Sequence, residues 1–215
     1  MSTMLIHELL QAMQQTLYMV FTSTLLAILF GLPLGTCLFS SRHIKNNPIL
    51  HHFIAMLVNA CRSIPFIILL VALIPLTRLL VGTSIGVNAT IVPLTLGATP
   101  FFARLVSNIY ENLPHGLLEA GASMGATSWQ LIRYILIPEA LPALIHASTV
   151  TAIALVNYSA MAGTVGGGGL GDLAIRFGYQ RFNVSIIIAT VILLILIVQL
   201  LQIGGDRLAK RFLHN

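Results

Sequence analysis

The stretch VSIIIATVILLILIVQLLQI, residues 184–203, carries no charged side chain over twenty positions. The hydrocarbon core of a bilayer is about 30 Å thick, and an α-helix crosses it with about 20 apolar residues. Inside lipid, only a helix or a closed barrel satisfies its own backbone hydrogen bonds. This stretch therefore predicts a membrane-spanning helix.

Four further segments meet the same criterion. They are residues 16–40, 57–76, 85–106 and 140–163, of which the last two are interrupted by polar residues or proline. Charged residues make up only 8% of the 215 positions, whereas soluble domains average about 25%. We therefore expect residues 1–215 to form one all-α integral membrane domain with five transmembrane helices, surrounded by a lipid membrane.

The segment before residue 16 has two interpretations. Its apolar residues recur at helical spacing, at Leu5, Ile6, Leu9, Leu10 and Met13. This pattern is typical of a short helix lying in the membrane interface, but it fits an extension of the first span equally well. The basic start and small-residue cleavage site of a secretory signal are missing, so we expect the first span to be retained.

The basic residues predict the orientation, because Lys and Arg concentrate on the cytoplasmic side of membrane spans. With the N-terminus outside and the C-terminus inside, the inner side holds Arg42, Lys45, Arg104, Arg133, Arg207, Lys210 and Arg211. The outer side holds Arg78, Arg176 and Arg181. Arg62 is expected near the inner end of the second span. Because the basic residues are scattered between apolar runs, the net charge of +5 does not indicate nucleic-acid binding.

The acidic residues bear on how transport would be driven. Ion-coupled carriers and pumps usually hold Asp, Glu or Lys within the membrane. Here all the acids are assigned to loops or span ends: Glu8, Glu111, Glu119, Glu139, Asp172 and Asp206. This argues against an ion-driven carrier, although polar side chains and backbone carbonyls could still bind sodium.

No catalytic or energy-converting motif is found in the sequence. The phosphate-binding pattern GxxxxGK[ST] is missing. Gly166, Gly168 and Gly171 satisfy GxGxxG, but they follow a membrane span rather than a β-strand. Cys37 and Cys61 lie in apolar segments without metal-binding spacing. We expect no catalytic residue, no metal site and no cofactor in this chain.

The loop between the third and fourth expected spans, about residues 108–139, carries the most informative motif. It reads EAGASMG at 119–125 and, nine residues later, ILIP at 135–138. Pro114 is well placed near a helix start, and a helix of small residues can enter a groove closely. The loop therefore predicts a docking helix, with a plain amphipathic helix at the membrane surface as the alternative.

This spacing resembles the EAA motif of binding-protein-dependent ABC importer permeases, which is EAA, three residues, Gly, nine residues and I-x-L-P. It departs from the family pattern at Gly121, where Ala is most common, and at Ile137, where Leu is. The resemblance implies a cytoplasmic coupling helix that is seated in a cleft of a separate ATPase subunit. It assigns this contact to Leu117, Leu118, Glu119, Ala120, Gly121, Met124, Gly125 and Ala126. It further implies that Glu119 is a polar contact or cap at the helix start and that Gly125 turns the chain away.

A wider resemblance, from Arg62 onward, is to the permease family of methionine importers. It rests on the runs RSIPFIILL (62–70), VGTSIG (81–86), IVPLT (91–95), PEALP (138–142), YSAM (158–161) and GGLG (168–171). It implies the type I importer fold in a bacterial inner membrane. The implied partners are a second copy of the chain, two ATPase subunits that bind ATP and Mg, and an extracytoplasmic substrate-binding protein. Methionine as cargo rests on resemblance alone, and another amino acid or a small sulfur compound is the alternative.

Polar residues interrupt the outer half of the fourth span. The candidates for a translocation path are Asn157, Tyr158, Ser159 and Met161. The resemblance places Met161 where paired subunits narrow the path, and an unbranched thioether can repack as helices move. The alternative is that these side chains only pack between helices.

The last outer loop, residues 166–183, begins with a run of glycines. It is expected either to be a flexible connection or to form part of the surface that receives a binding protein. In the second case Arg176 and Arg181 would be charges at the rim of that surface.

Overall fold

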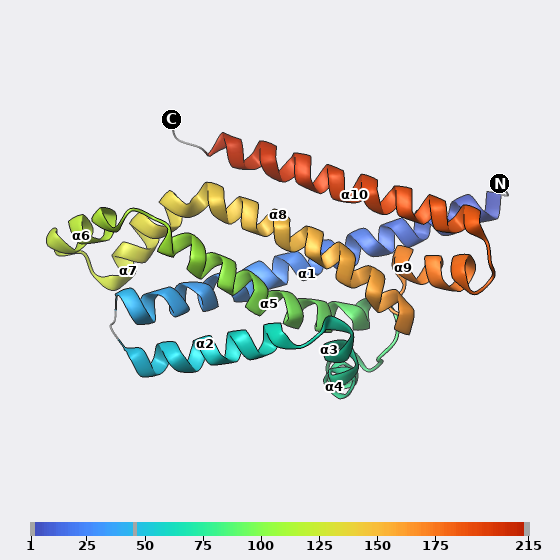
Figure 1. The fold of residues 1–215 in the computed structure, drawn as a ribbon, viewed down its shortest axis with the longest axis horizontal. Coiled ribbons are helices and arrows are strands. Elements are labelled where there is room, and N and C mark those ends of the chain that lie inside the picture. The colour runs from blue at the N-terminus through green and yellow to red at the C-terminus, as the bar shows by residue number, and fades with distance from the viewer. Residues whose placement is uncertain (1–2, 45–46, 213–215) are drawn as a thin grey trace.

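The computed structural model describes residues 3–44 and 47–212, and every regular element within them is a helix. The elements are α1 (Thr3–His43), α2 (Pro48–Ser63), α3 (Phe66–Ala72), α4 (Ile74–Val81), α5 (Val87–Glu111), α6 (His115–Ser123), α7 (Ser128–Gln130), the π-helical η1 (Leu131–Leu136), α8 (Ile137–Ala162), the 3₁₀ turn η2 (Gly163–Val165), α9 (Gly169–Leu173), the π-helical η3 (Ala174–Tyr179) and α10 (Val184–Arg211). The long helices α1, α5, α8 and α10 run along the length of the molecule (Figure 1). The all-α prediction is confirmed.

Four helical stretches among the described residues are long and apolar enough to cross a bilayer: Ile6–His43, Val87–Glu111, Ser128–Val165 and Val184–Arg211. A fifth crossing is counted if the bent pair α2 and α3 forms one span. Because α1 is continuous from Thr3, the N-terminal segment extends the first span and is not a separate interfacial helix. Of the residues used to predict the orientation, Lys45 lies outside the described part of the chain.

The second expected span, residues 57–76, is not one straight helix. α2 begins earlier, at Pro48, and the axes of α2 and α3 differ by 102°. The break lies at Ile64, whose backbone is extended at φ −82° and ψ 124°. A residue before proline is pushed out of the helical region by the proline ring, and Pro65 has no N–H with which to continue the helix. The apolar run is therefore continuous in sequence, but the chain changes direction by 102° within it.

The earlier start of α2 also corrects the expected position of Arg62. Arg62 is the fifteenth residue of α2, so a rise of 1.5 Å per residue places it about 21 Å from the start of that helix. It was expected near the inner end of the second span. It lies instead at the bend, far from the loop that joins α1 to α2.

α1 and α5 share the most extensive helix contact among the described residues, and Gly31 and Gly35 permit it. A Cβ atom at Gly31 would meet the carbonyl oxygen of Thr99 at 2.9 Å, and one at Gly35 would meet Val106 Cβ at 2.7 Å as well as the carbonyl oxygen of Ala103. Small residues four apart let two membrane helices bring their backbones together. The small-residue pair in the first span is thus the packing face toward α5.

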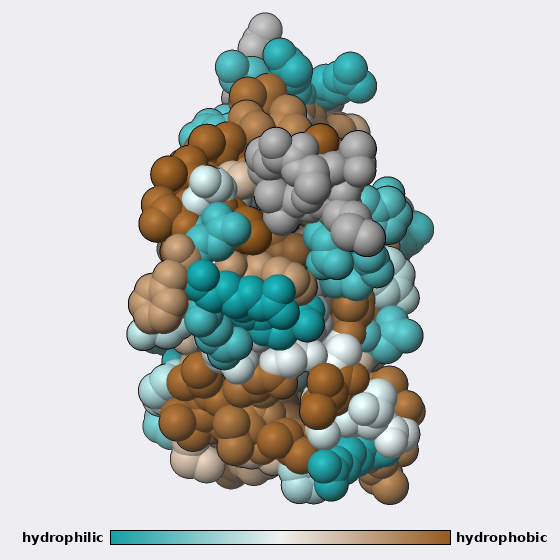
Figure 2. Space-filling view, turned by 90° about the vertical axis from the view of Figure 1, so that its right-hand side faces the viewer, coloured by the Kyte–Doolittle hydropathy of each residue, from teal (hydrophilic) through white to brown (hydrophobic). Residues whose placement is uncertain are grey.

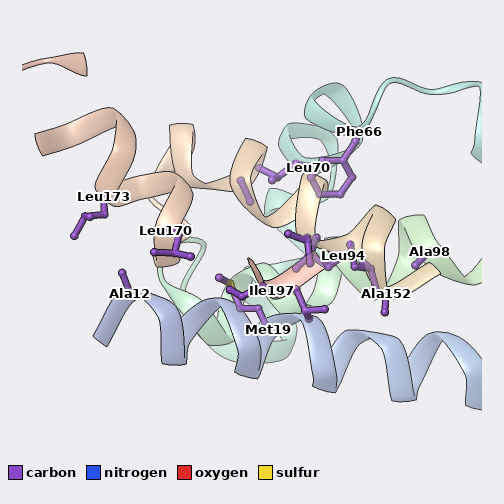
Figure 3. Packing of buried hydrophobic residues seen from close by; sticks show 14 of the residues in the cluster. Ala12, Met19, Phe66, Leu70, Leu94, Ala98, Ala152, Leu170, Leu173 and Ile197 are labelled. Atoms are coloured by element: carbon purple, nitrogen blue, oxygen red, sulfur yellow. The ribbon is translucent and has the colours of Figure 1, made fainter. Parts of the chain in front are cut away.

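One apolar core joins α1, α3, α5, α8, α9 and α10. It includes Met19, Phe66, Leu94, Leu155 and Leu170, all nearly or fully buried. Figure 3 shows Leu170 of α9 lying over α1 beside Ala12 and Met19, and Phe66 and Leu70 of α3 on the other side of the cluster. The short helices α3 and α9 are therefore built into the core of the bundle and do not lie loosely on it.

We predict that Gly35→Ala weakens the fold. The added methyl group would collide with backbone atoms of α5, which cannot rotate away, and overpacking of this kind costs about 1–3 kcal/mol. Thermal unfolding of the purified protein in detergent should show a lower melting temperature. Gly204→Ala is the matched control, because nothing lies within 4 Å of a Cβ there, and a helical Gly→Ala change contributes up to about 1 kcal/mol of stability. Equal melting temperatures for both variants would contradict the packing argument.

Candidate functional site

The two ends of the bundle carry different elements. α6 and the C-terminus lie at one end, and the N-terminus and α9 lie at the other (Figure 1). Figure 2 views the second end and shows hydrophilic groups gathered across its middle, between apolar areas. The docking segment predicted from the sequence is thus separated from the last expected outer loop by the length of the bundle.

α6 is a nine-residue helix that extends beyond the end of α5. Pro114 is its N-cap and makes no side-chain cap hydrogen bond. Glu119 is the fifth residue of the helix and is exposed. A side chain caps only the N–H groups of the first turn, so Glu119 is not the helix cap. It remains free for a polar contact.

Gly125 ends α6 with a left-handed turn. Its φ is +79°, a conformation that glycine adopts without steric cost. The Gly125 N–H donates to Ala122 O at 2.9 Å, and the Ala126 N–H donates to Gly121 O at 3.1 Å. These two bonds form the Schellman motif, which satisfies carbonyls that a helix end leaves open. The chain is thereby directed away from α6 toward α7.

Gly121 lets α6 lie close to the next helical segment. It is buried, and a Cβ there would meet Leu131 Cδ2 and Ile135 Cδ1, each at 2.6 Å. The departure from the family's usual Ala at this position therefore coincides with a tight contact between α6 and η1. Leu117 and Leu118 are half-buried. The opposite side of the helix is exposed.

We call this exposed side the outward face of α6, defined by Glu119, Ala120, Ser123 and Met124. The spacing of these positions places them on one side of a helix. Met124 is 80% exposed, and the neighbouring Trp129 is 66% exposed. Large apolar side chains this open are typical of an interaction surface. The outward face has one charge, at Glu119, beside small and apolar groups.

A capping box restarts the helix after Gly125. The Gln130 N–H donates to Thr127 Oγ1, and the Thr127 N–H donates to Gln130 Oε1 at 2.8 Å. The motif residue Pro138 lies in the first turn of α8, directly after the π-helical η1. The stretch from α6 to α8 is therefore one chain of short helices fixed by local hydrogen bonds, which connects the outward face rigidly to a membrane-spanning helix.

The four expected path residues on α8 fall on two sides of that helix. Asn157 and Met161 are exposed and one turn apart, and Met161 is 39% exposed. Ser159 is only 2% exposed, and its hydroxyl donates to the carbonyl of Val156 in its own helix. The ring of Tyr158 stacks on Phe66 with centroids 4.6 Å apart. Asn157 and Met161 thus face outward from the chain, whereas Ser159 faces the bundle.

The last expected outer loop is ordered helix and is tied to α1. The Gly169 N–H donates to Gln15 Oε1 and the Leu170 N–H donates to Thr16 Oγ1, both at 2.9 Å. Residues Gly169–Leu173 of α9 are buried. A flexible connection is therefore the wrong interpretation of this part of the loop. No local sequence pattern predicts these two α1 side chains, because they lie 154 positions away from their partners.

The two predicted rim charges lie just after α9. Arg176 Nε donates to Asp172 Oδ1 at 2.8 Å, and this hydrogen bond with the carboxylate raises the pKa of Arg176. The guanidinium of Arg181 lies 4.5 Å from the centroid of the Phe177 ring. Within residues 3–44 and 47–212, no three His, Cys, Asp or Glu side chains gather closely enough to hold a metal ion.

These features define a multi-pass helical membrane protein with a short exposed helix, α6, at one end and polar groups around α9 at the other. The family model of the binding-protein-dependent transport system inner membrane component matches residues 23–214. The chain therefore belongs to that family of permease components.

Individual relatives agree with the family. The probable D-methionine transport system permease protein MetI of Vibrio cholerae is 50% identical over 210 residues, covering 96% of this chain and 93% of the relative. The D-methionine transport system permease protein MetI of Escherichia coli K12 is 50% identical over 165 residues, covering 76% of each chain. A chain in an inward-facing structure of the MetNI methionine ABC transporter has a TM-score of 0.98 at 46% identity, with full coverage of both chains.

We predict that Gly125→Ala loosens the end of α6. A left-handed backbone costs a residue with a Cβ about 1 kcal/mol more than glycine, so amide hydrogen exchange over residues 117–126 should become faster. Gly116→Ala is the control, because Gly116 lies in the same helix and has nothing within 4 Å of a Cβ. Unchanged exchange in Gly125→Ala would show that the turn does not depend on glycine.

Proposed function

We propose that this chain is the permease subunit of an ATP-driven importer, that it translocates methionine delivered by an extracytoplasmic binding protein, and that a separate ATPase supplies the energy. The observation that carries the proposal is α6, a short helix with a small-residue outward face and a rigid link to α8. The MetI relatives named above support methionine as the cargo. The chain is non-catalytic in this assignment, and ATP and Mg bind the partner ATPase.

The proposed assembly contains two copies of this chain, two ATPase subunits and one binding protein. Many large apolar side chains are exposed in the single chain, including Leu79, Leu80, Leu200 and Phe182, and lipid or a second copy would cover them. A closed twofold dimer is the commonest way for such a chain to complete a path. The N-terminus is placed outside and the C-terminus inside, so that α6 faces the ATPase and α9 faces the binding protein.

The outward face of α6 would transmit force in this assembly. Ala120 and Ser123 are small enough to let an ATPase cleft close around the helix, while Glu119 offers one polar contact. Because α6 packs on η1 through Gly121 and η1 continues into α8, displacement of α6 would move a membrane-spanning helix as a lever.

Glu119→Lys tests this contact. Reversing the only charge on the outward face should reduce recovery of the ATPase with the permease, or the uptake obtained per ATP hydrolysed, by about thirtyfold. Losing one partner of a buried, hydrogen-bonded charge pair costs about 2 kcal/mol or more, and each 1.4 kcal/mol is about tenfold. Membrane insertion should be unaffected because Glu119 is exposed. Glu8→Lys makes the same charge change near the start of α1, at the other end of the bundle from α6, and serves as the control for ATPase recovery. Full ATPase recovery and full transport in Glu119→Lys would count against docking through α6.

The proposed gate lies on the exposed face of α8. Met161 and Asn157 lie one turn apart there, where a second copy would bring its own α8. A flexible thioether can fill a narrow opening and repack when helices move. Ser159 is buried within this chain and donates to a carbonyl of its own helix. We therefore assign it no contact with cargo.

Met161→Ala tests the gate. Removing the side chain should leave a gap in the closed path, so that basal ATP hydrolysis and uptake become uncoupled and labelled methionine leaks from loaded proteoliposomes several-fold faster. Leu196→Ala, at an apolar residue on α10 that is 51% exposed against 39% for Met161, should leave the leak rate unchanged. Unchanged uptake, hydrolysis and leakage in Met161→Ala would remove the support for this assignment.

A further inference from the structure

Arg62 is an exposed charged residue in the last turn of α2, and that helix ends part-way along the bundle (Figure 1). It lies at the end of α2, about 21 Å along the helix from Pro48 at 1.5 Å per residue, whereas the hydrocarbon core measures about 30 Å. A long side chain near a helix end can reach the interface, but the adjoining backbone turns by 102° into α3 and does not continue outward. In the proposed importer, whose bundle crosses the bilayer along its length, Arg62 lies at membrane depth, and an ionisable residue there is by default a functional group.

The bend places Arg62 at the mouth of a cavity of about 130 Å³. Its lining is mixed: Cys61, Arg62, Ile64, Phe66, Leu69, Gly97, Phe101 and Tyr158. These residues come from α2, the bend, α3, α5 and α8, so one space is bounded by four helices. Tyr158 adjoins Asn157, one of the proposed path residues on α8.

Arg62 has no carboxylate partner in the part of the chain that the structure describes. The ion pairs there are Arg176 with Asp172 and His146 with Asp206. All six acidic residues of the sequence lie within the described ranges, so no Asp or Glu of this chain neutralises Arg62. A guanidinium is always charged and presents a planar set of donors suited to a carboxylate. An anion from outside the chain would complete the site.

We infer that Arg62 and this cavity bind the α-carboxylate of the amino acid while it crosses the membrane. The inference rests on the proposed importer function and names a substrate contact within it. The guanidinium donates to the carboxylate, and the rings of Phe101 and Tyr158 lie beside the rest of the molecule, where aromatic rings attract a thioether. A space of this size accommodates the head of an amino acid, and the side chain extends into the open path.

Cys61 reports directly on this site because it lines the same cavity. The measurement uses the assembled transporter carrying Cys37→Ser and compares the rate at which Cys61 is labelled by the anionic reagent sulfonatoethyl methanethiosulfonate with the rate for a cationic analogue. We expect the ratio of the anionic to the cationic rate to be higher with Arg62 in place than after Arg62→Gln. Arg62→Lys should keep the preference because it keeps the charge. Arg78→Gln is the matched control, since Arg78 lies away from the cavity beside Ser84.

Substrate protection is the decisive part of the experiment. Millimolar methionine should slow Cys61 labelling at least about threefold, whereas methioninol, which lacks the carboxylate, should not, and Arg62→Gln should abolish the protection. Equal protection by methioninol, protection that persists in Arg62→Gln, or no protection by methionine would each overturn the carboxylate site.

Uptake separates this inference from the proposed function. If the unmodified transporter with its binding protein takes up methionine in an ATP-dependent way but methionine does not protect Cys61 from labelling, the Arg62 site alone is rejected. Absent uptake rejects the importer proposal itself. If the unmodified transporter shows both uptake and protection of Cys61, we expect Arg62→Gln to lower the methionine taken up per ATP about tenfold, because a hydrogen bond to a charged group is worth about 1.5–3 kcal/mol. The loaded binding protein should still stimulate the ATPase in this variant.

Discussion

The structure depends on one constraint, which is that lipid offers no hydrogen bonds to the backbone. Each polar backbone group at membrane depth must find a partner within the protein, and long helices meet this requirement by themselves. Where the chain leaves the helical conformation, its backbone groups need other hydrogen-bond partners. At the glycine run after α8, the Gly167 N–H donates to Ala162 O and the Gly86 N–H donates to Gly166 O. Gln15 and Thr16 of α1 serve the start of α9.

These anchors explain why the helix breaks persist. Each break is paired with a neighbouring element: α9 is bonded to α1, and α3 is inserted into the core through Phe66 and Leu70. The break between α2 and α3 brings the exposed Arg62 and the half-buried Tyr158 of α8 to the lining of one cavity. A bundle of unbroken helices would be a stable anchor with no path through it.

Much of this architecture could be predicted from the sequence. The uninterrupted stretch 184–203 falls within α10, and the loop motif falls on α6, η1 and the start of α8. Both are local patterns, determined by residues that are close in the chain. The second span was misplaced because an apolar window does not show that the chain changes direction at Pro65. For the same reason Arg62 was expected near the start of the span, whereas it lies at the end of α2. The contact of α9 with Gln15 was not predictable, since no local pattern links residues so far apart.

We propose that this chain transports only when a separate ATPase drives it through α6. The most direct measurement is uptake of labelled methionine into proteoliposomes that hold the permease alone or the permease with its ATPase, with binding protein supplied outside in both cases. Our account predicts accumulation only with the ATPase and internal ATP, and none from a proton or sodium gradient. Accumulation by the permease alone under an ion gradient would contradict it.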